Sequence, residues 1–370
     1  MNQNQTMPYG PFRKRLNQTA DYFSKPQNLI LLVLGVVLSI LTIAPMITIV
    51  FDSFAIHVGT IETIYSGRID GLTIQHYVEL FTGTLSQRNF WTPFFNTLQL
   101  SIYSCFVALL FGGFVAYLVT RTNLKFKKFI SAVFIFPYIM PQWTLAMVWR
   151  NLFNSAAVTG GANGFLAATL GIEMPLWWCS GMFPSAVVMG LHYAPFAYIL
   201  IGSIFRNMDA NLEEAATILN TPRWKIVTHV TLPMVKPAIL STILLVFSGA
   251  MGSYPVPHYL KLVTMSTRYV EISGGRPGQS SIISIVMMLI GVTILLMNQV
   301  TTSGRKQYTT VTGKSGQASQ VNLGKYGKYI IGGVLIFLTI FTSIYPLISF
   351  AIETFLPNPG DYSGFTLKWW

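Results

Sequence analysis

Long apolar stretches separated by short polar ones dominate the pattern along this chain. About 20 apolar residues, at a helical rise of 1.5 Å each, cross the roughly 30 Å of hydrocarbon in a bilayer. Seven segments approach that length, at residues 28–51, 94–119, 129–149, 176–205, 237–251, 281–300 and 329–352. The pattern therefore predicts an all-α polytopic membrane protein with about seven transmembrane helices.

The fifth segment is the shortest, and residues that interrupt helices follow its core. These are Gly249, Gly252, Pro255 and Pro257. Non-helical backbone at membrane depth is tolerated where it is buried in protein or lines a cavity. We expect this helix to break, or to line a cavity, near its outer end.

Composition and charge agree with a membrane location. Hydrophobic residues make up 52% of the chain and charged residues 10%, against roughly 25% charged residues in soluble domains. The net charge is +12, and 17 of the 24 basic residues lie in segments that are cytoplasmic if the N-terminus is cytoplasmic. This is the positive-inside distribution, so the charge reflects orientation and not nucleic-acid binding. Residues 1–26 are polar and contain no cleavable signal peptide, so the first helix should be retained.

A short amphipathic stretch lies between the fourth and fifth segments, on the predicted cytoplasmic side. Asn211 can cap a helix, with Glu214 reaching back from three residues later. Apolar residues recur at i, i+3, i+4 and i+7, namely Leu212, Ala215, Ala216 and Leu219. The stretch predicts a short helix with one apolar face.

This helix should end at Asn220, because asparagine is second to glycine in adopting the left-handed conformation that stops a helix. Thr221 is then a suitable N-cap and Pro222 a suitable first residue for a second short helix. Trp224 and Val227 place apolar groups on its first turns. We expect this second helix to close before Leu232-Pro233.

The spacing of these residues resembles the EAA motif of the membrane subunits of binding-protein-dependent ABC importers. The motif is present as Glu214-Ala215-Ala216, Asn220, Val230 and Leu232-Pro233, with asparagine in place of the family glycine and valine in place of isoleucine. The resemblance covers about residues 96–300. It implies that the hairpin couples to a separate ATPase subunit through Leu212, Glu214, Ala215, Ala216, Leu219, Asn220, Pro222, Leu232 and Pro233.

The resemblance also implies the partners and the membrane. They are nucleotide-binding ATPase subunits, an extracytoplasmic solute-binding protein and a second permease half or subunit, in a bacterial plasma membrane. Glu214 would anchor the hairpin, while Ala215 and Ala216 would allow close approach. The chain itself should be a transport subunit and not an enzyme, with ATP bound by the partner and no cofactor of its own.

One short motif suggests ATP binding and is rejected. Gly313-Lys314-Ser315 looks like the end of a phosphate-binding loop, but Tyr308 stands where that loop needs another glycine. Residues 303–328 are instead a polar linker between membrane segments. We find no catalytic constellation elsewhere in the sequence.

The apolar segments contain almost no ionisable residues, whereas ion-coupled carriers usually keep some within the bilayer. His192 is deep within the fourth segment, next to Tyr193. It could touch a translocation path or form a hydrogen bond between helices. Pro137 and Pro141 flank Tyr138 in the third segment and should free backbone carbonyls, which either line a path or bend the helix. These five residues are the candidate path.

The two cysteines, Cys105 and Cys179, lie in or beside membrane segments without histidine partners nearby in the sequence. They form neither a metal site nor a disulfide framework. We expect both to be packing residues, and we expect no metal site in this chain.

The end of the chain repeats its beginning. Residues 43–47 and 52–54 match residues 344–348 and 353–355, and Gly71-Leu72-Thr73 matches Gly364-Phe365-Thr366. The predicted organisation is a cytoplasmic tail (1–27), a leading helix with an outside loop (28–93), a permease core (94–302) containing the hairpin (207–235), a linker (303–328) and the start of a second repeat (329–370). The chain thus resembles a tandem permease truncated after its first half.

The tandem arrangement and residues 308–314 are most similar to ferric-iron-type permeases. Importers of polyamines, thiamine, phosphonates and other small solutes share the architecture, so the substrate stays open. The alternative function is an ATP-independent carrier or channel, in which the cytoplasmic hairpin is only structural. A membrane-embedded enzyme is disfavoured, because polar residues do not cluster at one depth.

Overall fold

The computed structural model describes residues 25–208, 215–216, 218–303, 321–358, 361–362, 364–368 and 370. The regular secondary structure of these residues is helical, apart from two isolated β-bridges, and turns and irregular segments connect the helices. The all-α prediction is confirmed. The first helices in chain order are α2 (Pro26–Asp52), α3 (Glu62–Ser66), α4 (Gln75–Thr82), η1 (Gln87–Trp91), α5 (Thr92–Ala108), η2 (Leu109–Gly113) and α6 (Phe114–Arg121), where η denotes a π-helical segment.

The remaining helices follow in chain order. They are α7 (Lys127–Val133), α8 (Phe136–Ile139), α9 (Gln142–Phe153), α10 (Ala156–Thr159), α11 (Phe165–Leu170), α12 (Leu176–Cys179), α13 (Met182–Asn207), α15 (Arg223–Ile226), η3 (Val227–Thr231), α16 (Leu232–Gly252), α17 (Pro255–Tyr259), α18 (Met265–Ile272), α19 (Pro277–Ser303), α20 (Gly324–Thr339), η4 (Ile340–Ile344) and α21 (Tyr345–Glu353).

Six helical runs in the described residues are long and apolar enough to cross a membrane. They are Pro26–Asp52, Gln87–Arg121, Leu176–Asn207, Trp224–Gly252, Pro277–Val300 and Gly324–Glu353. A seventh span is possible if Lys127–Ile139 and Gln142–Phe153, which meet at a bend of 99°, count as one. This agrees with the predicted number, but the third segment is sharply broken and the last begins earlier than expected.

The span Trp224–Gly252, which matches the fifth predicted segment, shows why proline is an uncertain helix boundary. The sequence predicted a separate short helix before Leu232-Pro233 and a membrane segment starting at residue 237, whereas one helical run extends from Trp224 to Gly252. That prediction was wrong because η3 lies directly before Leu232-Pro233. The same arrangement recurs where η1 precedes Thr92-Pro93 and η4 precedes Tyr345-Pro346.

The π-helical turns explain how these helices continue through proline. A proline has no N–H to donate, and its ring clashes with the carbonyl four residues earlier in an α-helix. A π turn is wider than an α turn, so it separates the groups that would otherwise collide. The predicted break at the outer end of this span is confirmed, because α16 ends at Gly252 and α17 begins separately at Pro255.

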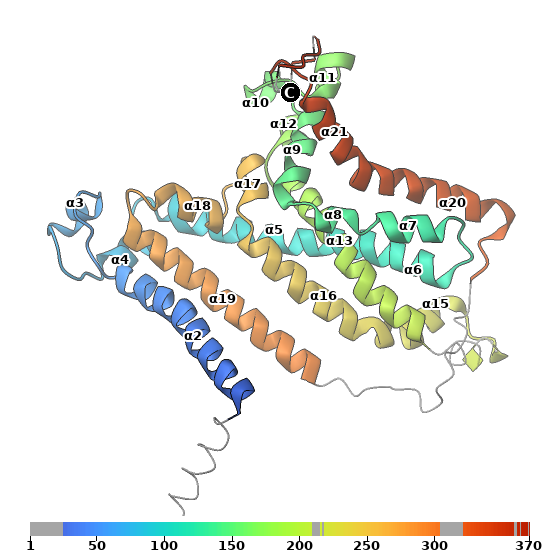
Figure 1. The fold of residues 1–370 in the computed structure, drawn as a ribbon, viewed down its shortest axis with the longest axis horizontal. Helices are drawn as coiled ribbons and strands as arrows, with labels where there is room; N and C mark the ends of the chain where they lie inside the picture. The colour runs from blue at the N-terminus through green and yellow to red at the C-terminus, as the bar shows by residue number, and fades with distance from the viewer. Residues whose placement is uncertain are drawn as a thin grey trace, which may run out of the picture.

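Helix α13 is the centre of the bundle and packs against α5, α6, α9 and α16 (Figure 1). Small residues allow the closest approaches. A Cβ on Gly112 would overlap Ala194, and a Cβ on Gly190 would overlap Val107. In a membrane, where burial of apolar surface gives little force between helices, such close packing supplies much of the attraction.

Both cysteines are buried free thiols, as the packing prediction expected. The Cys105 thiol donates to the carbonyl of Ile243 at 3.4 Å, and that of Cys179 to the carbonyl of Phe153 at 3.1 Å. Each therefore links two helical elements of the core.

The internal repeat is visible in the hydrogen bonds of the two loops that follow α2 and α21. Thr73 donates its N–H to the carbonyl of Phe54 at 2.7 Å, and the matching Thr366 donates to the matching Phe355 at 2.7 Å. The two threonine hydroxyls also repeat, since Thr73 Oγ1 accepts from the N–H of Gln75 and Thr366 Oγ1 accepts from the N–H of Lys368. Chance similarity between apolar helices does not account for the same turn in both places.

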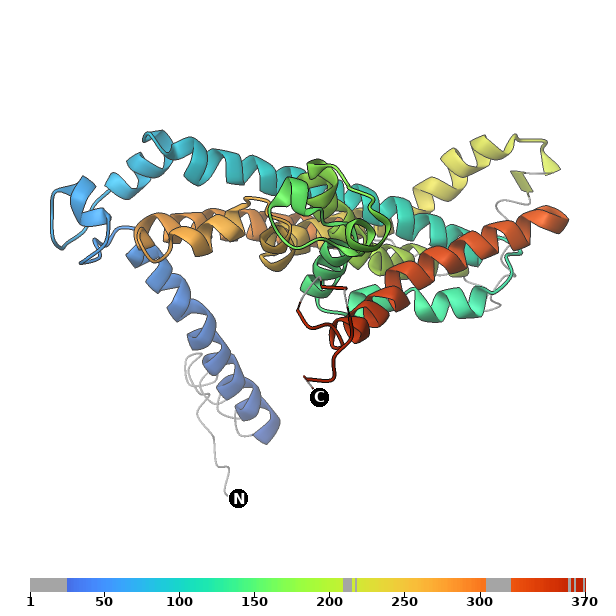
Figure 2. The same ribbon diagram turned by 90° about the horizontal axis from the view of Figure 1, so that it is seen from above.

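The first helix of each repeat, α2 in the first copy and the α20–α21 run in the second, makes different contacts with the bundle. Helices α20 and α21 lie along α7, α8 and α9, and bury Ser343, Pro346 and Ser349 (Figure 1). Helix α2 meets α19 and then diverges from the bundle, with none of its residues buried (Figure 2). In the first copy, the positions that match the buried stripe are Thr42, Pro45 and Thr48, and all three are exposed.

Candidate functional site

The hairpin predicted to be cytoplasmic follows α13 and is described in part. Ala215 and Ala216 are helical, and the N–H groups of Leu219 and Thr221 donate to their carbonyls at 3.2 and 3.1 Å. Three of the predicted residues, Asn211, Leu212 and Glu214, lie outside the described residues. Their proposed capping and anchoring roles stay predictions.

Asn220 adopts the left-handed conformation that the sequence predicted, with φ = 52°. The second helix begins at Arg223, and the carbonyl of Pro222 accepts the N–H groups of Lys225 and Ile226 at 2.9 and 3.3 Å. Pro222 therefore precedes the helix as its cap residue in place of Thr221, and the helix begins one residue later along the chain than predicted. The reversal of the chain between the two hairpin helices lies at Asn220, as predicted.

The hairpin presents large apolar side chains to its surroundings. Ile218 is 81% exposed, Leu219 is 79% exposed and Trp224 is 62% exposed. Lys225 Nζ lies 5.6 Å from the centre of the Trp224 ring, a cation–π distance. Large apolar side chains exposed within a few residues of one another are consistent with a protein interaction surface. The sequence pattern identified Leu219 and Trp224 but missed Ile218, which lies off the i, i+3, i+4, i+7 series.

Leu232 and Pro233, predicted to end the hairpin, lie instead in the first turn of α16. Both are exposed. Because α15, η3 and α16 form one run from Trp224 to Gly252, the hairpin surface is continuous with a membrane helix.

The broken third span contains the other candidate residues. Met140 is extended, with φ = −71° and ψ = 144°, as expected for a residue before proline. Pro141 has no N–H, so the carbonyl of Pro137 loses its helical donor. His192 donates its Nδ1–H to that carbonyl at 2.8 Å. The carbonyl can only accept, and this fixes the proton on Nδ1.

His192 is thus the interhelical hydrogen-bond donor that the sequence left as one of two possibilities. Tyr138 packs edge-on against Phe196, with ring centres 4.3 Å apart, and is partly exposed. The structure brings the five candidate path residues together at the break between α8 and α9. Whether they line a translocation path stays a prediction.

Two further residues belong to this cluster and were missed. Gln142 Nε2 donates to the hydroxyl of Tyr193 at 2.7 Å, and Ser253 Oγ donates to Gln142 Oε1 at 2.7 Å. The available signal was a polar glutamine directly after Pro141 in an apolar segment. Its partner Ser253 lies 111 residues away along the chain, so no local pattern could pair them.

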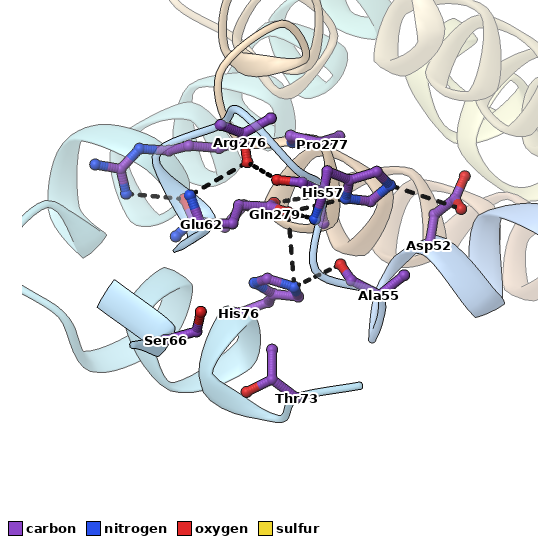
Figure 3. Close-up of polar contacts among 12 residues, drawn as sticks. Asp52, Ala55, His57, Glu62, Ser66, Thr73, His76, Arg276, Pro277 and Gln279 are labelled. Atoms are coloured by element: carbon purple, nitrogen blue, oxygen red, sulfur yellow. Dashed lines mark hydrogen bonds and ion pairs between the residues drawn. The ribbon is translucent and has the colours of Figure 1, made fainter. Parts of the chain in front are cut away.

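A second polar cluster, also missed, ties the outer loop to α19 (Figure 3). Glu62 is fully buried, and its Oε1 accepts the N–H of Gly278 at 2.6 Å. Its Oε2 accepts from His57 Nδ1 at 2.9 Å, and His57 Nε2 lies 3.8 Å from Asp52. Gly278 lies in the first turn of α19, and the N-terminus of a helix favours negative charge, so the position of the Glu62 carboxylate is favourable.

His76 completes this outer cluster. Its Nε2 donates to the carbonyl of Ala55 at 2.9 Å (Figure 3). This leaves Nδ1 to accept from the hydroxyl of Tyr65. Burial, together with the charge of Glu62, raises the pKa of Tyr65 above its ordinary value, so its hydroxyl remains protonated. The cluster is fixed by complementary hydrogen bonds, and among the described residues no group of three or more His, Cys, Asp or Glu side chains could hold a metal ion.

The remaining motif, Gly313-Lys314-Ser315, lies outside the described residues. Nothing in the structure bears on it. No assignment of ATP binding to this chain follows.

Comparison with known proteins agrees with this architecture. The chain is 26% identical over 280 residues to a ferric transport system permease protein of Actinobacillus pleuropneumoniae, covering 74% of this chain and 38% of that protein. It is 24% identical over 219 residues to the molybdenum transport system permease protein of Escherichia coli, covering 55% and 91%. The chain thus spans less than half the length of the ferric permease.

A solved structure has a similar fold. A chain of a bacterial alginate ABC transporter, in complex with an alginate-bound periplasmic protein, matches with a TM-score of 0.55 at 16% identity, covering 79% of this chain and 98% of that one. A family model also matches residues 108–356, two thirds of the chain. The protein belongs to the family described as binding-protein-dependent transport system inner membrane component.

Proposed function

We propose that this chain is the membrane-spanning permease subunit of an ABC importer, which moves a small solute using ATP hydrolysed on a separate subunit. The observation that carries the proposal is the exposed apolar hairpin surface of Ile218, Leu219 and Trp224, continuous with a membrane helix. This surface provides both a docking site and a mechanical connection to the bundle. Family membership supports the same assignment.

The proposed coupling site comprises this surface with Leu212, Glu214, Ala215, Ala216, Asn220 and Pro222. The left-handed Asn220 sets the angle between the two hairpin helices. The small side chains of Ala215 and Ala216 allow a partner to approach the backbone. The partner is proposed to be a nucleotide-binding ATPase subunit on the cytoplasmic side, with the N-terminus of this chain on that side too.

A second permease half is a further proposed partner. Helices α20 and α21 show where a leading helix packs on a permease core, since they bury Ser343, Pro346 and Ser349 against α7 to α9. The matching stripe of α2 is exposed. A second core of the same kind would cover it by the same contacts, whether it is part of the same polypeptide or a separate one.

The first solute to test is ferric iron, because of the similarity to the ferric permease over 74% of this chain. An extracytoplasmic binding protein would deliver it to the outer loops. Molybdate is the natural comparison solute, since a molybdenum permease is also similar. Uptake of labelled ferric iron and molybdate into vesicles, each with its binding protein, tests the choice.

The decisive experiment for the function is affinity purification from the native membrane in mild detergent, comparing wild type with Glu214→Lys and Ala216→Trp. We expect a nucleotide-binding subunit to copurify with wild type and to be lost from both variants, which still insert in the membrane. ATP-dependent uptake should be lost with it. Recovery of no ATPase with wild type would instead favour an ATP-independent carrier or channel.

A further inference from the structure

The side chain of Gln142 joins three helical elements that are distant in sequence. It stands at the first position of α9, its Nε2 donates to Tyr193 on α13, and its Oε1 accepts from Ser253, the residue after α16. Both bonds are 2.7 Å long. An amide is suited to this position because it donates at one end and accepts at the other.

Both sides of the break at Pro141 are held by adjacent residues of α13. His192 binds the carbonyl of Pro137 on α8, and Tyr193 binds Gln142 on α9. The bend of 99° between these helices is therefore fixed against the centre of the bundle. Ser253, directly after the end of α16, adds a contact from a different part of the bundle.

Helix α16 leads back to the cytoplasmic hairpin without a break. The run from Trp224 to Gly252 contains 29 residues, about 43 Å of helix at 1.5 Å per residue. Its approach to α13 is close, because a Cβ on Gly249 would overlap the Tyr193 hydroxyl. Displacement or rotation of α16 relative to α13 would therefore change the position of Ser253 relative to Gln142.

We propose that Gln142 is a positioning residue for transport, through which movement of the hairpin reaches the broken span. This inference rests on the proposed function. The Ser253–Gln142 hydrogen bond is formed in one access state and broken in the other, while His192 and Tyr193 keep α8 and α9 on α13. A bond between neutral groups suits this role, since it changes a conformational equilibrium by only about three- to tenfold.

The test uses the complete transporter in vesicles, with its ATPase subunit and binding protein, and compares Ser253→Ala, Ser253→Thr and Gln142→Met. We expect Ser253→Ala and Gln142→Met to lower the solute moved per ATP hydrolysed by about three- to tenfold, and to raise ATP hydrolysis without binding protein. Ser253→Thr keeps the hydroxyl and should retain coupling. Ser273→Ala is the matched control, because the Ser273 hydroxyl donates to the nearby carbonyl of Val270 at 2.9 Å and not to a distant helix in the part of the chain that the structure describes.

A second measurement follows the conformation directly. Cysteine at position 253, in a chain with Cys105→Ala and Cys179→Ala, is labelled with a thiol reagent with and without ATP and vanadate. We expect the labelling rate to differ between the two states. Equal rates, together with normal coupling in Ser253→Ala, would overturn the inference while wild-type transport upholds the proposed function. Failure of wild type to couple ATP to uptake would overturn both.

Discussion

His192 donates its Nδ1–H to the carbonyl of Pro137 at 2.8 Å, across the interface between α13 and α8. This carbonyl is the one that Pro141 leaves without a helical donor. A sequence-imposed break in one helix is thus compensated by a side chain from another. Buried carbonyls left without a donor are costly, and the bond explains why the bend persists inside the bundle.

Replacement of His192 by phenylalanine should destabilise the fold, because the Pro137 carbonyl loses its donor. We expect a loss of about 1–3 kcal/mol, measured as a lower melting temperature of the purified protein in detergent. His229→Phe is the control, because His229 is exposed and, among the described residues, its hydrogen-bond partners are Thr228 and Lys225 of the same helical run. Equal melting temperatures for His192→Phe and wild type would contradict this role.

Ile218→Asp should weaken binding of the proposed ATPase subunit. Central apolar contacts in interfaces often contribute 2 kcal/mol or more, so we expect about a thirtyfold loss of affinity in a pull-down titration. Ile64→Asp is the control, since Ile64 is 79% exposed on the outer loop. If both substitutions had the same effect, Ile218 would have no specific place in the interface.

Asn220→Gly should leave the hairpin intact, whereas Asn220→Val should strain it. Glycine tolerates φ = 52° without strain, whereas a β-branched residue at that angle is strained by about 1–2 kcal/mol. We expect glycine to preserve ATPase association and valine to reduce it about tenfold, in the same titration. Normal association of Asn220→Val would show that the chain reversal does not depend on this residue.

Gly332→Leu should release α20 from the bundle. A Cβ at Gly332 would lie 3.3 Å from the carbonyl oxygen of Lys125, whereas one at Gly333 meets nothing within 4 Å. Gly333→Leu is therefore a control of the same size and chemistry. Overpacking should destabilise the first variant by about 1–3 kcal/mol, seen as faster proteolysis near α20. Identical digestion of the two variants would argue against the packed position of α20.

Glu62→Ala should detach the outer loop from α19. Glu62 is buried and accepts from the N–H of Gly278 and from His57. Hydrogen bonds to a charged group contribute about 1.5–3 kcal/mol each, so we expect markedly faster protease cleavage in residues 53–82 on the outer side. Glu173→Ala, at an exposed site, should not change the cleavage pattern.

Several features of the fold could be predicted from local sequence. The apolar lengths gave the number of spans, and Asn220 gave the chain reversal at its observed φ of 52°. The repeat was also readable, and Thr73 and Thr366 form matching bonds. Each of these features depends on the length or the conformational preference of a few neighbouring residues, and this preference does not depend on tertiary contacts.

Proline boundaries were less predictable. Pro141 ends a helix, whereas Pro233 lies inside a continuous run. Both residues lack an N–H, so the local chemistry is the same. The difference is that a π turn precedes Pro233, while at Pro141 the lost hydrogen bond is replaced by His192 from another helix.

By itself, the sequence determined the class of the protein, the membrane segments and the hairpin, because hydrophobic length and backbone preference act locally. Only the tertiary structure decided that Gln142 joins Tyr193 and Ser253, and that Glu62 reaches Gly278, 216 residues further along the chain. Such pairs depend on where separate helices meet. The physical reason is that a buried polar group pairs with the partner that helix packing places within about 3 Å of it. The spacing of residues along the sequence does not specify which partner that is.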